Sequence, residues 1–173
     1  MSHFKNKAPY LKSYTSRVES QGLQLLEANR PGIVTNVSLA NEGDSDEQLS
    51  ISLSARYSLG AFSMSLDEAK AIHFFKKAGF DTTNLCESNE GFVLNELGET
   101  QGARLELFVG DAGKELYVNI SIDAIVVSAQ DLIDVPDFER EAIVMAKASN
   151  ACSLMLRDFL TLNTALDSIS APV

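Results

Sequence analysis

The stretch RLELFVGDAGKELYVNISID, residues 104–123, decides the fold, because its apolar residues fall at every second position on both sides of a glycine-rich turn. The apolar positions are Leu105, Leu107, Val109, Leu116, Val118, Ile120 and Ile122. Such alternation places apolar side chains on one face of a strand and polar side chains on the other. Gly110 and Gly113 favour a tight reversal between the two runs. We therefore expect an antiparallel β-hairpin here, with one face in the core.

Two segments nearer the amino terminus alternate in the same way, over residues 33–39 and 49–57. The opposite face of the second segment carries serines and Arg56, so one face is dry and the other is wet, which is typical of antiparallel sheets. The acidic residues 41–47 between the two segments predict a hairpin loop. Residues 92–97 predict a further short strand.

Three segments show helical spacing. Apolar residues over 9–29 recur every three or four positions, and Gly22 on that face either weakens the helix or lets another part of the chain approach closely. Residues 65–68, Ser-Leu-Asp-Glu, have the pattern of a capping box, so a helix should follow and end at Gly79. A third helix is expected over residues 138–168, which corresponds to about 45 Å.

The order of these elements predicts an α+β fold, with an antiparallel sheet of about five strands, helices packed on one face and a long C-terminal helix. A chain of 173 residues that is 45% hydrophobic can bury one core. Because no repeat or linker divides it, we expect a single domain over residues 1–173, with residues 1–8 flexible.

The chain is acidic, with 24 Asp and Glu residues against 14 Lys and Arg residues and a formal net charge of −10. This charge opposes attraction to a phosphate backbone, so nucleic acid is not an expected partner, although a local basic contact through residues 1–30 stays open. No apolar run has the length of a membrane span or of a secretory signal. Cys86 and Cys152 form no C-x-x-C motif, which favours a reducing compartment. We expect a cytoplasmic protein that does not enter membranes.

Residues able to carry chemistry are sparse. His3 and His73 are the two histidines, so one chain cannot build a metal site of several His ligands. Lys70, Lys76 and Lys77 flank His73 on the polar side of the predicted helix, as a solvated face or as an anion site. The acidic loop at residues 44–47 resembles the start of a calcium loop but lacks the required Gly and Glu further on.

The sequence contains neither G-x-S-x-G nor a glycine-rich phosphate-binding motif. Tyr57, Phe108 and Tyr117 project from predicted strands, as core residues or as a stacking platform. Carboxylates are numerous, but no spacing identifies an acid–base pair. We therefore expect no catalytic residues, no cofactor and no metal, and we keep a carboxylate-dependent enzyme as an alternative.

The last predicted helix carries two apolar stripes, and an ordinary surface helix needs one. One stripe contains Ala142, Met145, Ala146, Ser149, Ser153, Leu156 and Leu160. The other provides the expected self-association or partner surface, which consists of Val144, Ala148, Ala151, Met155, Phe159 and Leu162. Another helix of the same chain could cover this second stripe instead. We expect a homo-oligomer that also binds another protein.

The order of predicted elements resembles that of the small acidic chaperones of type III secretion. The resemblance covers most of the chain but rests on no motif, so it transfers no functional residues, and the final helix is long for that family. It implies a dimer that holds segments of another protein. The leading hypothesis is therefore a non-enzymatic, chaperone-like binding module. A structural or assembly component of a larger particle, viral or from a mobile element, is the second hypothesis.

Overall fold

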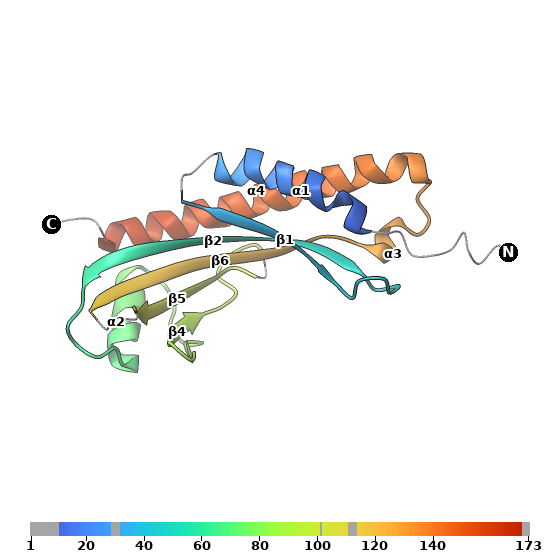
Figure 1. The fold of residues 1–173 in the computed structure, drawn as a ribbon. Helices are drawn as coiled ribbons and strands as arrows, with labels where there is room; N and C mark the ends of the chain where they lie inside the picture. The colour runs from blue at the N-terminus through green and yellow to red at the C-terminus, as the bar shows by residue number, and fades with distance from the viewer. Residues whose placement is uncertain (1–10, 29–31, 101, 111–113, 171–173) are drawn as a thin grey trace. The chain divides into compact units, whose positions relative to one another are not determined.

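The computed structural model of the chain describes residues 11–28, 32–100, 102–110 and 114–170, with side chains up to residue 167. The elements in chain order are η2 (Leu11–Tyr14), α1 (Thr15–Gly22), η3 (Leu23–Glu27), β1 (Val34–Ala40), β2 (Gln48–Ala61), α2 (Glu68–Lys77), β3 (Cys86–Glu87), β4 (Gly91–Leu94), β5 (Arg104–Val109), β6 (Glu115–Ser128), α3 (Ala129–Leu132) and α4 (Asp137–Ser170) (Figure 1). η2 is a 3-10 turn and η3 a π-helical turn. The expected flexibility of residues 1–8 concerns a segment outside the described residues.

The strands form one six-stranded antiparallel sheet in the order β1-β2-β6-β5-β4-β3. The predicted α+β class, antiparallel sheet and long C-terminal helix are confirmed, with six strands instead of about five. The added strand is β3, whose two residues are too short for a periodic signal in the sequence.

Contacts between Cα atoms divide the chain into two compact units. The first contains Met1–Leu53 and Asp123–Leu156, and the second contains Ser54–Ile122 and Arg157–Val173. Each of β2, β6 and α4 contributes residues to both units. The expectation of a single domain stays a prediction.

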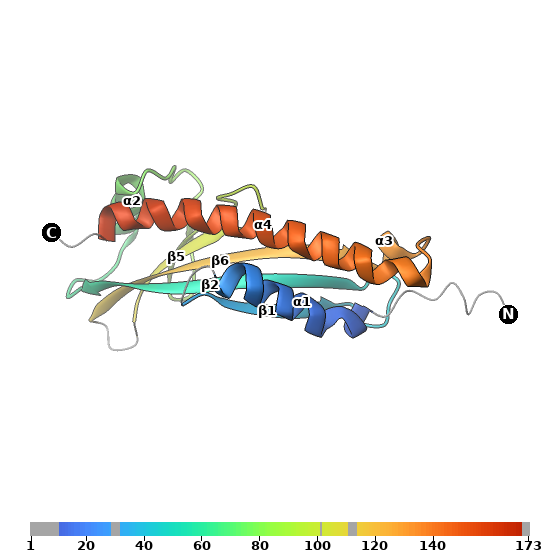
Figure 2. The ribbon, with the colours of Figure 1, turned by 90° about the horizontal axis from the view of Figure 1, so that it is seen from above.

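In the first unit, α1 and residues 137–156 of α4 lie side by side over the strands (Figure 2). Arg17 on α1 forms an ion pair with Glu141 on α4 at 3.2 Å. Gly22 is buried against the sheet, where an added Cβ would lie 2.9 Å from Ile51 Cδ1 and 3.5 Å from Thr35 Oγ1. Of the two roles expected for this glycine, the structure therefore shows close approach.

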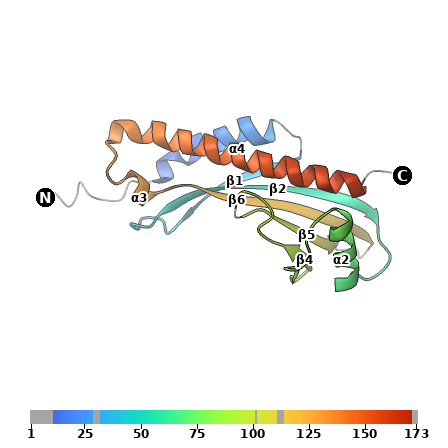
Figure 3. The ribbon, with the colours of Figure 1, turned by 180° about the vertical axis from the view of Figure 1, so that it is seen from behind.

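In the second unit, the predicted hairpin is confirmed, with Leu107 opposite Val118 in the β5–β6 register. β4 pairs with the other edge of β5. α2 lies beside β5 (Figure 3) and buries Ala71 and Phe75. This arrangement brings one face of α2 next to the apolar side chains of the hairpin.

The dry and wet faces predicted for β2 are also present. Leu49, Ile51 and Leu53 are buried, whereas Ser54 and Arg56 on the opposite face are exposed. The strand is longer than predicted, because it continues to Ala61. The same alternation buries Val118, Ile120 and Ile122 of β6.

The predicted start of α2 was wrong by two residues. The N-cap is Asp67 and not Ser65, because Asp67 Oδ1 accepts a hydrogen bond from the Lys70 amide at 2.9 Å. An Asp at this position satisfies a free amide of the first turn as well as a Ser does. The predicted stop is confirmed, since Gly79 has φ +92°, a left-handed conformation that favours glycine.

Candidate functional site

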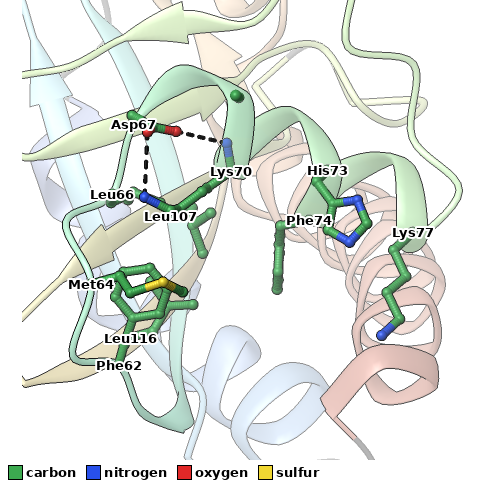
Figure 4. Close-up of a pocket in the computed structure, with 11 residues that line it drawn as sticks. Phe62, Met64, Leu66, Asp67, Lys70, His73, Phe74, Lys77, Leu107 and Leu116 are labelled. Carbon is green, nitrogen blue, oxygen red and sulfur yellow. Dashed lines mark hydrogen bonds and ion pairs between the residues drawn. The ribbon is translucent and has the colours of Figure 1, made fainter.

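A pocket of about 500 Å³ lies in the second unit, between α2, the chain segment that precedes it and the β5–β6 hairpin (Figure 4). We call it the α2 pocket. It is lined by Phe62, Met64, Leu66, Asp67, Ala69, Lys70, His73, Phe74, Lys77, Leu107 and Leu116. The volume and the mainly apolar lining are those of pockets that hold a ligand group.

The lining contributed by α2 follows from helical periodicity. Lys70, His73, Phe74 and Lys77 are spaced i, i+3, i+4, i+7 and therefore share one face. Ala71 and Phe75 of the same helix are buried in the core. The predicted apolar face also contained Phe74, but this ring points into the pocket and is half-buried (Figure 4).

The apolar wall opposite α2 comes from two sources. Leu107 of β5 and Leu116 of β6 belong to the dry face of the hairpin. Phe62, Met64 and Leu66 come from the connection between β2 and α2, and Met64 is 59% exposed. The pocket thus offers an apolar surface that the chain itself leaves partly uncovered.

The polar rim of the pocket is mainly basic. Lys70 Nζ donates to Asp67 Oδ2 at 3.3 Å and to the Ser65 carbonyl at 2.7 Å. The hydrogen bond from the Lys70 amide is the main reason why the pKa of Asp67 lies below its ordinary value. Among the described residues, the side chains of His73 and Lys77 have no hydrogen-bond or ion-pair partner and are available to a ligand.

The anion site considered for this helix is thus partly assembled. Lys70, His73 and Lys77 reach the pocket, whereas Lys76 does not line it. The Thr83 hydroxyl, which donates to Asp81 Oδ1 at 2.6 Å, is the main reason why the pKa of Asp81 lies below its ordinary value. The charge of Lys76 lowers this pKa by a smaller amount. The arrangement can hold an apolar group while its rim attracts negative charge.

The predicted self-association or partner surface on α4 is contradicted by burial. Its six side chains are at most 6% exposed, and they are Val144, Ala148, Ala151, Met155, Phe159 and Leu162. The structure exchanges the roles of the two stripes, because the other stripe, which includes Leu160 at 46% exposure, faces outward. Both stripes are apolar, so periodicity alone could not tell which one packs on the sheet.

The three aromatic residues considered as a stacking platform do not share a face. Tyr57 donates its hydroxyl to Asn163 Oδ1 at 2.8 Å, on the helix-covered side. Phe108 and Tyr117 stack on the other side, with ring centroids 5.6 Å apart, and the Arg56 guanidinium lies 5.1 Å from the Phe108 centroid. Phe108 is 5% exposed, so its ring is covered and does not offer a free face for stacking.

Among the described residues, Glu47 and Asp158 are the buried carboxylates, and sequence reasoning identified neither as buried. Glu47 is 2% exposed and accepts from the amides of Leu11 at 2.9 Å and Gly43 at 3.0 Å. This carboxylate of the acidic loop therefore ties the loop to η2. The described residues hold no group of three or more His, Cys, Asp or Glu side chains that could share a metal ion.

Asp158 on α4 is the second buried carboxylate, at 4% exposure. It accepts from the amides of Glu99 at 3.0 Å and Thr100 at 2.7 Å, and also from the Thr100 hydroxyl. A Cβ on Gly98 would lie 2.4 Å from Asp158 Cγ, so glycine is needed for this close approach. Asp158 thus fixes the segment between β4 and β5.

Sequence reasoning also missed the apolar wall formed by Phe62, Met64 and Leu66. These three residues alternate with serines, but out of phase with the apolar face of the preceding strand, so they gave no continuation of its pattern. Their role depends on the position of α2 and of the β5–β6 hairpin around them, which local sequence does not give.

The comparisons with known proteins add no relationship: no family model, no curated protein and no solved structure matches the chain. In the described part of the chain, no helix combines the length and apolar character needed to cross a membrane.

Proposed function

We propose that the protein is a non-enzymatic, chaperone-like binding module that holds a segment of another polypeptide in the α2 pocket. A large apolar side chain of that segment occupies the pocket, and its acidic residues lie beside Lys70, His73 and Lys77. The observation that carries the proposal is the combination of an apolar cavity with a basic rim on a chain of net charge −10.

The apolar wall supplies the first part of the binding energy. Burial of a Leu or Phe side chain contributes about 1.5–3 kcal/mol. The ligand group would cover Phe62, Met64 and Phe74, which are half-buried or exposed in the free chain. An aromatic or branched aliphatic anchor is the type of side chain that such a cavity accepts.

The spacing of the basic groups favours a polypeptide over a small amphiphile. Lys70 and Lys77 are seven residues apart on α2, which corresponds to about 10 Å along the helix axis. In the structure Lys70 Nζ is held by Asp67 and the Ser65 carbonyl, whereas Lys77 lies about two turns further along the helix. A segment with several acidic residues can place one beside each of them.

The overall negative charge does not prevent this contact. Charges more than about 8 Å apart are largely screened at physiological ionic strength. The local field at the rim is therefore governed by the two ammonium groups of Lys70 and Lys77 against the single carboxylate of Asp67, while the distant carboxylates add a weak repulsion. This repulsion disfavours acidic ligands that lack an apolar anchor.

The buried carboxylates of Glu47 and Asp158 hold loops in place, which agrees with a binding role better than with catalysis. Glu47 and Asp158 each accept hydrogen bonds from backbone amides of a loop. These bonds occupy the acceptor oxygens that acid–base catalysis would require. Both groups therefore serve structural roles in this proposal.

The proposal is tested by fluorescence anisotropy with a short labelled peptide that carries one phenylalanine between glutamates. We expect saturable binding, which Lys77→Glu weakens by about fivefold or more, because the substitution replaces an attraction by a repulsion. Lys76→Glu is the matched control: it makes the same charge change on the same helix outside the pocket lining. We expect it to change the affinity less than twofold.

Two further controls separate the parts of the site. Replacing the peptide phenylalanine by alanine, or its glutamates by lysines, should each abolish measurable binding. Ala69→Phe should block the cavity from an exposed helix position. Equal effects of Lys76→Glu and Lys77→Glu, or tight binding of decanoate without binding of the peptide, would overturn the proposal.

A further inference from the structure

The edge of the sheet at β1 carries a second inference, which is independent of the α2 pocket. β1 is the last strand on its side of the sheet, so one row of its backbone amides and carbonyls has no partner strand among the described residues. Such a row is a ready template for pairing with another strand. Folded proteins ordinarily protect an edge of this kind.

The opposite edge of the sheet shows that protection. β3 contains two residues, one of which is the charged Glu87. Short length and charge both discourage pairing with a further strand. By contrast, β1 has seven residues, VTNVSLA, with no charged residue and no proline.

The neutrality of β1 stands out against the composition of the chain. Charged residues make up 22% of the sequence, and the net charge is −10. Two copies that approach through most of their surface therefore repel each other. Because β1 carries no charged residue, two copies can approach through this edge without electrostatic repulsion between facing side chains.

Apolar groups are exposed next to this edge. Val34 at the start of β1 is 62% exposed, and Leu23 of η3 is 54% exposed. Glu27, one helical turn after Leu23, accepts a hydrogen bond from the Thr35 hydroxyl of β1 at 2.5 Å. The stripe of η3 that contains Leu23 and Glu27 therefore lies on the β1 side of the helix layer.

We propose that two copies of the chain associate through antiparallel pairing of β1 with β1, centred on Val37. In this register, Asn36 lies opposite Ser38 and Val34 opposite Ala40 of the second copy. Side chains of one face thus meet side chains of the same face. No like charges face each other, and the pairing extends over about 23 Å of strand.

The partner proposed for β1 is a second copy of the chain, because β1 can pair with itself in this register. Because β1 has an odd number of residues, the central residue, Val37, lies opposite Val37 of the second copy across the two-fold axis. Two-fold pairing is the commonest symmetry of homo-oligomers. The exposed side chain of Leu23 lies on the side of the helix layer nearest β1, so the second copy would cover part of it. The proposed interface contains none of the buried α4 residues.

The test is the solution mass of the full chain by light scattering or sedimentation at tens of micromolar. The wild type should have twice the 18.8 kDa mass of one chain. Asn36→Lys with Ser38→Lys places two like-charged pairs across the proposed register and should give a monomer. Both positions are exposed, so the variant should keep its fold, which circular dichroism verifies.

The matched control is Asn36→Lys with Ser38→Glu. In the proposed register each new lysine faces a new glutamate of the other copy, so this variant should remain a dimer. A wild-type monomer, a double-lysine variant that still dimerises, or a folded Lys/Glu variant that is monomeric would overturn the proposal. None of these results bears on peptide binding at the α2 pocket.

Discussion

Replacing Asp158 by alanine should destabilise the protein by about 2–5 kcal/mol, through the loss of acceptors for buried donors. The Asp158 carboxylate is 4% exposed and accepts from the Glu99 amide, the Thr100 amide and the Thr100 hydroxyl. Thr100 is 8% exposed, so both of its donors would remain buried without a partner. Each buried donor left unsatisfied costs about 1–3 kcal/mol, whereas the part-buried Glu99 amide loses less because Glu99 is an exposed residue that water can reach.

Urea unfolding followed by circular dichroism measures this loss. Arg157→Ala is the matched control, because the neighbouring Arg157 forms an ion pair with Glu99 at 2.7 Å while both side chains are at least 60% exposed. An exposed pair of this kind contributes about 0–1 kcal/mol. If Asp158→Ala lowered the free energy of unfolding no more than Arg157→Ala, the structural role assigned to this carboxylate would be refuted.

The remaining predictions concern α4 and the cysteines. Phe159→Ala should lower the free energy of unfolding by about 3–5 kcal/mol, because Phe159 is 0% exposed. Leu160→Ala should lower it by less than about 1 kcal/mol, because Leu160 is 46% exposed. Similar losses in the two variants would contradict the assignment of the core-facing stripe. Cys86 is exposed, while burial raises the pKa of the Cys152 thiol to about 11. A thiol reagent at neutral pH should therefore modify Cys86 in the folded protein and both cysteines in urea, and native modification of Cys152 would contradict its burial.

The local periodicities of the sequence predicted the main elements of the fold. Alternation over residues 104–123 predicts the β5–β6 hairpin, because a half-buried strand imposes a period of two on its residues. Pro136 and the helical spacing after it predict α4, which runs from Asp137 to Ser170. These signals lie within single elements and need no knowledge of their neighbours.

Features that depend on tertiary packing could not be predicted. Either apolar stripe of α4 could have faced the sheet, and the burial of Phe159 with the exposure of Leu160 is set by the strands beneath the helix. The α2 pocket joins Phe62 to Leu107 and Leu116, which are far apart in sequence. The sequence predicts a possible anion site of His73 with Lys70, Lys76 and Lys77, but not the apolar cavity beside this helix or the absence of Lys76 from its lining.

The most direct test of the proposed function is an amide chemical-shift titration of the isotopically labelled chain with the phenylalanine–glutamate peptide. The account predicts progressive, saturable shifts for residues 62–77 and for Leu107 and Leu116, which surround the α2 pocket. The amides of β1 should not respond. Saturable shifts confined to other parts of the chain, or no shifts at peptide concentrations up to the millimolar range, would contradict the claim that this pocket holds an acidic, apolar polypeptide segment.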